Sequence, residues 1–211
     1  MFRTAPLLIL AFVLLASVCA QAQSQAVYAV DPANSKVEIH VAKDGFFKAF
    51  GHDHLVAATK FSGEVRADSA KLEDSSVSFI VDAGALRVMD PGESEKDRKE
   101  VQATMLGEHV LDVAHHPKIE FVSKKVKVSS AADGKHDLQV TGMLKLHGAE
   151  KPFVLPAHVQ ISDAGKLTCD LEIELLQSDF GITPYKAAGG AVRVKDKLKL
   201  VFHIVAQKTS S

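Results

Sequence analysis

The sequence predicts an all-β fold, an antiparallel barrel with one short helix. From residue 27 onward apolar and polar residues mostly alternate with a period of two, which is typical of strands with one buried and one solvated face. Clusters of turn-forming residues separate these segments, and a single stretch has helical features. Seven or eight such strands remove their edges by closing into a barrel, and an eight-stranded barrel has room for a small apolar ligand. A two-sheet sandwich is the alternative.

The alternation locates the individual strands. In the first of them, Val37, Ile39 and Val41 alternate with Lys36, Glu38 and His40. The other predicted strands span residues 59–66, 77–83, 118–128, 137–146, 153–161, 167–175 and 192–205. Turns are predicted at Asp31-Pro32, at residues 132–135 and 163–166, and at Gly189-Gly190.

The helical stretch begins at Ser94 and runs to about Val110. Ser94 followed by Asp97 resembles a capping arrangement, and the first turn is acidic, as helix N-termini favour. Val101 and Met105 share one face of this helix. The charged run 93–100 is predicted to be the solvated start of the helix rather than a docking site.

The first 22 residues have the features of a secretory signal peptide. Arg3 is followed by an apolar run over residues 7–18 and then by small residues that end in Ala20-Gln21-Ala22. The run is shorter than the roughly 20 residues of a spanning helix. We expect cleavage after Ala22 or Ala20, one mature domain over residues 23–211, and a periplasmic or secreted protein. An uncleaved anchor and lipidation at Cys19 are the alternatives.

Composition limits the classes of function. The 25 Lys and Arg residues against 26 Asp and Glu residues leave no basic excess for binding nucleic acid. Cleavage would leave Cys169 as the single cysteine, so the domain forms no internal disulfide. Alternation places Cys169 on one face with Leu167, Leu171 and Ile173, which predicts a buried, unreactive side chain. A more exposed Cys169 would permit a disulfide-linked homodimer.

Histidines are the most informative polar residues, and His52 and His54 form their densest cluster. On an extended segment these two side chains point to the same side and are able to share a metal ion. Further ligands would come from His40, His109, His115, His116 or Asp53. In the other interpretations the histidines bond to loop carbonyls, surround a barrel mouth or contact a ligand's headgroup.

Local catalytic motifs are absent from the sequence. It has no Gly-x-Ser-x-Gly elbow, no His-Glu-x-x-His helix and no phosphate-binding glycine loop. We therefore predict no catalytic residues and no cofactor. A metal- or haem-binding module on His52 and His54, and a hydrolase acting at a barrel mouth, are the alternatives to a binding protein.

Five motifs, in order along nearly the whole mature chain, resemble those of the YceI-like family, the bacterial polyisoprenoid-binding, lipocalin-like proteins. Each pairs strand residues with a glycine, a proline or a turn. They are Tyr28-x-Val30-Asp31 with Ser35-x-Val37-x-Ile39-x-Val41; Phe61-Ser62-Gly63-x-Val65; Leu111-Asp112-Val113 with Pro117-x-Ile119-x-Phe121-x-Ser123; Val140-Thr141-Gly142-x-Leu144-x-Leu146-x-Gly148 with Lys151-Pro152-Phe153-x-Leu155; and Ser178-Asp179-Phe180-Gly181-Ile182.

The resemblance implies an eight-stranded lipocalin-like barrel that encloses a long isoprenoid or similar amphiphile, which predicts a carrier or sequestering protein. For such a protein we expect transient contact with a membrane or a membrane protein. Two regions depart from the family pattern, residues 51–54 and residues 97–101 with 108–111, and they leave the headgroup and the ligand open. Alternation within the strands gives the candidate cavity residues as Val37, Ile39, Val41, Phe79, Val81, Leu144, Leu171, Ile173, Leu200 and Phe202.

Overall fold

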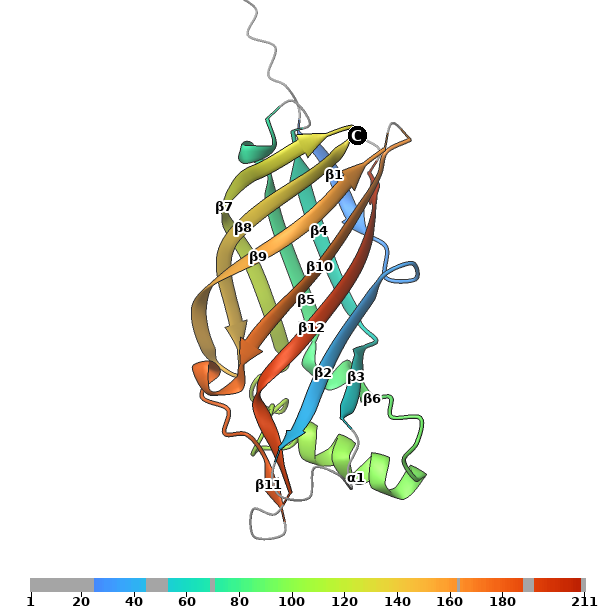
Figure 1. The fold of residues 1–211 in the computed structure, drawn as a ribbon, viewed down its shortest axis with the longest axis vertical. Helices are drawn as coiled ribbons and strands as arrows, with labels where there is room; N and C mark the ends of the chain where they lie inside the picture. Colours follow the sequence, from blue (N-terminus) through green and yellow to red (C-terminus); the bar gives the residue numbers. More distant parts are fainter. Residues whose placement is uncertain (1–24, 45–52, 69–70, 163, 188–191, 210–211) are drawn as a thin grey trace, which may run out of the picture.

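The computed structural model describes residues 25–44, 53–68, 71–162, 164–187 and 192–209 (Figure 1). Residues 1–22, which carry the predicted signal peptide, and His52 lie outside the described residues. Within the described part of the chain, no helix is both long and apolar enough to span a membrane.

Eight strands form a closed antiparallel ring in the order β1-β4-β5-β7-β8-β9-β10-β12, and β12 pairs with β1 to close it. This confirms the predicted eight-stranded barrel and excludes the sandwich. The ring strands are β1 (Ala26–Val30), β4 (Phe61–Ala67), β5 (Ser76–Asp82), β7 (Lys118–Ala132), β8 (Lys135–Leu146), β9 (Ala149–Ile161), β10 (Lys166–Leu176) and β12 (Val192–Lys208).

Three further strands prolong the barrel wall at one end. β2 (Lys36–Asp44) pairs with β12, β3 (His54–Ala58) pairs with β2, and β6 (Leu86–Val88) pairs with β3. Their registers continue those of β1, β4 and β5, so each of the first three barrel strands is broken in the middle. At the first break the Val205 N–H donates to Ser35 Oγ at 2.9 Å, which satisfies a ladder donor that β1 and β2 leave unpaired.

Two tight turns fix the register of the long central hairpins. Asp133-Gly134 joins β7 to β8, and His147-Gly148 joins β8 to β9. All four of these residues have positive φ, as a two-residue hairpin turn of the mirror-image type requires. The predicted turn at residues 132–135 is therefore confirmed. A short strand, β11 (Lys186–Ala187), pairs with the first two residues of β12.

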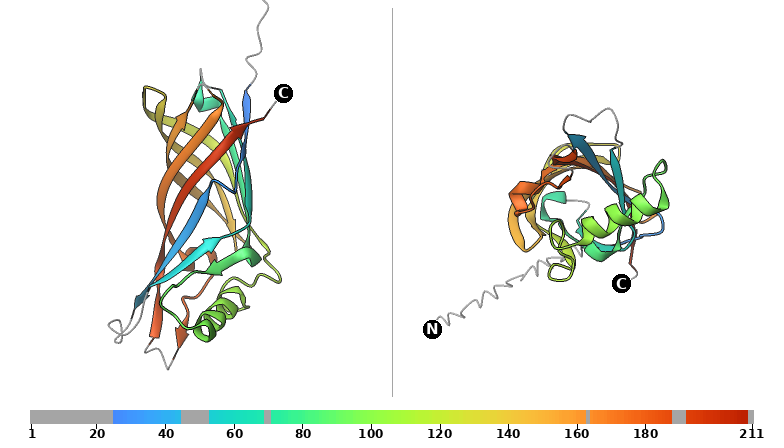
Figure 2. Two further views of the ribbon diagram at one scale, coloured as in Figure 1. Left: turned by 90° about the vertical axis from the view of Figure 1, so that its right-hand side faces the viewer. Right: turned by 90° about the horizontal axis from the view of Figure 1, so that it is seen from below.

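The helix α1 (Glu95–Leu106) lies across the end of the barrel that β2, β3 and β6 form (Figure 2). As predicted, Ser94 is its N-cap and accepts a hydrogen bond from the Asp97 N–H at 3.1 Å. The helix ends before Gly107 rather than at Val110. Gln102 holds it in place, because its amide accepts from the Val88 N–H and donates to the Leu86 carbonyl, both at 2.8 Å. The Gln102 side chain thus supplies hydrogen-bond partners for two backbone groups at the free edge of β6.

At the opposite end a short 3-10 helix, η2 (Leu72–Asp74), inserts Leu72 between the strands. Leu72 packs there with Val126, Leu138 and Ala157. The buried residues form four apolar clusters distributed along the inside of the barrel rather than one solid core. The space that they leave between them is the candidate site.

Candidate ligand cavity and its polar mouth

The barrel encloses a cavity of about 800 Å³. Its wall consists of the inward side chains of the strands, most of them Val, Leu, Ile, Phe and Ala. Leu72 of η2 lines one end, and Val101 and Met105 of α1 line the other. A cavity of this size and lining is typical of sites for small apolar ligands.

All ten residues that the alternation selects line this cavity. Three come from β2 (Val37, Ile39 and Val41), two from β5 (Phe79 and Val81), one from β8 (Leu144), two from β10 (Leu171 and Ile173) and two from β12 (Leu200 and Phe202). A period of two leaves no choice of face once the sheet closes, since successive side chains point to opposite sides.

Two glycines of the family motifs make room for phenylalanines of the cavity wall. A Cβ on Gly63 would lie 2.8 Å from the ring of Phe79, and one on Gly142 would lie 2.6 Å from the ring of Phe121. Neither glycine has a positive φ, so close approach explains them and backbone strain does not. Phe79 also contacts Phe61 and Phe202, with ring centroids 5.6 and 6.3 Å apart.

Cys169 lines the cavity on β10 among these apolar side chains. Burial, and to a smaller extent the charge of Asp170, raises the pKa of the Cys169 thiol to about 12. The thiol is therefore protonated at neutral pH, which agrees with the predicted unreactive side chain, although Cys169 is half-buried rather than fully buried because it borders the cavity.

Polar side chains gather at the end of the cavity that α1 covers. They come from β2, β3, β12, α1 and the segments that precede α1 and follow β10. The charged and polar lining residues at this mouth are Lys43, His54, Glu93, Asp97, Glu100, Thr104, Gln177, Tyr185 and Arg193. The barrel therefore has a long apolar interior with one polar end, which is the polarity of an amphiphile.

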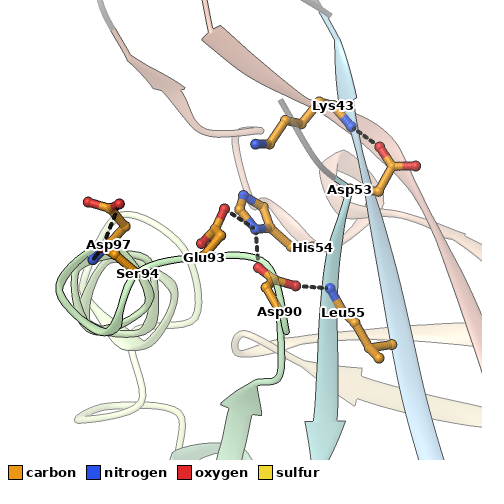
Figure 3. A network of polar contacts seen from close by, with 8 residues as sticks. All are labelled: Lys43, Asp53, His54, Leu55, Asp90, Glu93, Ser94 and Asp97. Atoms are coloured by element: carbon orange, nitrogen blue, oxygen red, sulfur yellow. Dashed lines mark hydrogen bonds and ion pairs between the residues drawn. The ribbon is translucent and has the colours of Figure 1, made fainter. Parts of the chain in front are cut away.

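The best-organised part of the mouth is a network of His54, Asp90 and Glu93 (Figure 3). His54 Nδ1 lies 2.5 Å from Asp90 Oδ2 and 3.7 Å from Glu93 Oε1. The other Asp90 oxygen, Oδ1, accepts a hydrogen bond from the Leu55 N–H at 2.6 Å. Asp90 is only 3% exposed, and the side chains of His54 and Glu93 are each 13% exposed.

Among the described residues, the structure brings none of the other predicted metal ligands to His54. Asp53 accepts from the Lys43 N–H, His115 pairs with Asp112, and the ring of His116 lies against that of His147. None of these belongs to the His54 network. The sequence does not single out Asp90, which follows β6 in an ordinary turn-like stretch. The prediction that residues 93–100 are solvated is wrong for Glu93, because the turn before α1 directs its side chain into the mouth, where it is 13% exposed. No spacing rule connects these two residues to His54, because Asp90 is 36 residues away and the fold alone brings them together.

The barrel, the enclosed apolar cavity and its single polar mouth define a class, the closed antiparallel barrels that are built around an internal cavity. The model of the YceI-like domain matches residues 28–206. The chain belongs to the YceI-like family, as the five motifs predict.

Similar proteins agree with this assignment. A UPF0312 protein of Shewanella denitrificans is 28% identical over 133 residues, which span 62% of this chain and 61% of that protein. The crystal structure of BcnA from Burkholderia cenocepacia is 25% identical, has a TM-score of 0.65, and is matched over 84% of this chain and 99% of that one.

Two more distant structures share the fold. A polyisoprenoid binding domain from Saccharophagus degradans, described as implicated in plant cell wall breakdown, is 12% identical with a TM-score of 0.58, over 88% of this chain and 99% of that one. The YCEI protein of Campylobacter jejuni is 18% identical with a TM-score of 0.54, over 74% and 85% of the two chains.

Proposed function

We propose that this protein binds the hydrocarbon chain of a long isoprenoid or a similar amphiphile inside its barrel, with the headgroup at the α1 end. The observation that carries the proposal is the cavity of about 800 Å³ with apolar walls and one polar mouth. Each CH2 group moved from water into such a lumen contributes about 0.8 kcal/mol, so a long chain binds without specific polar contacts. The polyisoprenoid binding domain from Saccharophagus degradans supports the choice of ligand class.

We assign binding rather than turnover to the cavity, because its walls supply apolar contacts along most of their length. The ten lumen residues selected by alternation are the proposed ligand contacts. The signal-like residues 1–22 support a periplasmic or secreted carrier or sequestering protein, which exchanges its ligand at a membrane surface. Amino-terminal sequencing of the protein exported by its native host tests the location and distinguishes cleavage after Ala22 from cleavage after Ala20.

The ligand is tested by native mass spectrometry of protein purified without detergent, followed by organic extraction. We expect a stoichiometric adduct of several hundred daltons that is lost on denaturation. A protein that carries no such adduct, and that fails to bind added long-chain isoprenoid alcohols, contradicts the proposal.

A variant at the deep end makes the test specific to the lumen. Ala157 lines the cavity beside Leu72, so Ala157→Phe fills the end farthest from the mouth. We expect it to bind short isoprenoids as well as the parent does and to bind long ones at least about tenfold more weakly, a loss of about 1.4 kcal/mol. Gln160→Phe, at an exposed position on the same strand, is the matched control and keeps the parent's chain-length preference. Equal effects of the two substitutions would place the ligand outside the barrel.

A further inference from the structure

A buried cluster of metal-ligand side chains lies at the cavity mouth. Among the described residues, His54, Asp90 and Glu93 are the one group of at least three His, Cys, Asp or Glu side chains whose donor atoms lie within 4.8 Å of one another. Two of the three, His54 and Glu93, also line the cavity. The cluster therefore borders the cavity through His54 and Glu93, while Asp90 lies behind them.

The cluster carries a negative charge that its neighbours do not balance. With a neutral imidazole it holds two carboxylates, and in the described part of the chain no lysine or arginine forms an ion pair with either of them. Lys43 and Arg193 bring two positive charges to the same mouth, but Asp97 and Glu100 bring two negative charges that offset them. A protonated His54 would still leave an excess of one negative charge. Buried charges of this kind are normally paired or bound to a metal.

Glu93 supplies an independent observation. Its Oε2 atom is buried and has no hydrogen-bond partner. A buried carboxylate oxygen without a partner loses its hydration and gains nothing in return. A doubly charged cation that the Glu93 carboxylate binds with both of its oxygens removes this cost, and its charge matches that of the two carboxylates.

The donor set identifies the ion. We propose that His54, Asp90 and Glu93 bind a divalent metal ion of the zinc class at the cavity mouth. One imidazole nitrogen and two carboxylate oxygens are ordinary zinc ligands, and three protein ligands leave a further position open. We place that open position on the lumen side, because His54 and Glu93 line the cavity. The Leu55 N–H fixes Asp90 through Oδ1 and leaves Oδ2 for the ion, as outer hydrogen bonds do in metal sites.

Binding of the metal ion requires a small change in the distances between the donor atoms. In a tetrahedral site the donor atoms lie roughly 3.3 Å apart, given bonds of about 2.0–2.2 Å. The pair His54 Nδ1 and Asp90 Oδ2, at 2.5 Å, opens by less than about 1 Å, and the pair His54 Nδ1 and Glu93 Oε1, at 3.7 Å, closes slightly. The ion thus replaces the hydrogen bond between His54 and Asp90.

The test uses untagged protein from which lipid and metal have been removed. Equilibrium dialysis against low micromolar Zn²⁺, with metal measured by mass spectrometry, should give one ion per chain. Glu93→Gln keeps the shape of the side chain and should weaken binding by more than about 100-fold, and His54→Ala should abolish it. His203→Ala is the matched control, because His203 forms a comparable pair with Asp170 on an exposed part of the barrel and should bind zinc like the parent.

X-ray absorption at the zinc edge should report one imidazole nitrogen together with carboxylate oxygens. Circular dichroism spectra that match the parent's will show that Glu93→Gln folds. No stoichiometric zinc in the parent, or parent-like binding by Glu93→Gln, overturns the proposal. So does a result in which His52→Ala loses the ion while Glu93→Gln keeps it. Because the lipid is absent throughout, none of these outcomes depends on the proposed lipid function.

Discussion

At the scale of single residues, Cys169 illustrates how the cavity changes side-chain chemistry. The thiol sits among apolar walls, and burial raises its pKa from 9.0 to about 12. In the unfolded chain the same thiol ionises near pH 9, so between these two values the unfolded state alone loses the proton. The contribution of the protonated thiol to stability is therefore complete below pH 9 and declines as the pH rises toward 12.

We expect two consequences for lipid-free protein. At pH 8 a charged disulfide reagent should modify Cys169 much more slowly in the native protein than in urea. In addition, the urea midpoint of the parent should fall more steeply between pH 8 and pH 10 than that of Cys169→Ala, which has no thiol to ionise. Fast modification of the native thiol would show that the lumen at Cys169 is open to water and reagent.

At the scale of elements, α1 is attached to the barrel through a narrow contact. Gln102 makes both hydrogen bonds to the β6 edge, whereas Val101 and Met105 supply the apolar contacts. Replacing Gln102 with Leu keeps the approximate size of the side chain and removes both bonds. A buried donor and acceptor without partners cost about 1–3 kcal/mol each.

If α1 unfolds only together with the barrel, we expect Gln102→Leu to lower the free energy of unfolding by about 2–4 kcal/mol. If α1 detaches locally, we expect unchanged global stability and loss of hydrogen-exchange protection at the amides of α1. Hydrogen exchange followed by mass spectrometry distinguishes these results by peptide. Lys99→Ala, which removes an exposed ion pair with Glu95 on the same helix, is the control and should change stability by less than about 1 kcal/mol. A parent-like exchange pattern and stability in Gln102→Leu would show that the apolar contacts alone hold the helix.

Elements also show how far the sequence determines the structure. The long strands β7 to β10 and β12 were predictable because alternation persists over ten or more residues, and the Ser94 cap followed from its side chain. β3 and β6 have five and three residues, too few for a period to be distinguished from chance. The same limit applies to the site: alternation identified the lumen wall, but the pairing of His54 with Asp90 depends on the register between β3 and β6.

At the scale of the whole molecule, the barrel encloses an apolar surface that the proposed ligand would cover. A ligand that binds only the folded state at 100 times its Kd adds about 2.7 kcal/mol of stability. For a domain of this size, that corresponds to a rise in Tm of about 5–10 °C. We expect this rise when a long isoprenoid alcohol is added to delipidated protein, measured by differential scanning calorimetry. The rise should shrink in Ala157→Phe and persist in Gln160→Phe. A bound adduct without a shift in Tm would show that the ligand binds the unfolded chain as well as the folded one, which contradicts binding inside a folded lumen.

The closing strand affects how the barrel is made. β12 is the last strand of the part of the chain that the structure describes, yet it pairs with β1, β2, β10 and β11. A chain that emerges from the ribosome or a membrane pore with its amino terminus first has seven ring strands in place before the eighth arrives. During that interval the side chains that later line the lumen are open to water and to other chains. The barrel therefore closes only when the 17-residue strand β12 pairs with β1. Until then the apolar inner face of the open sheet is exposed, and chaperones are able to bind it.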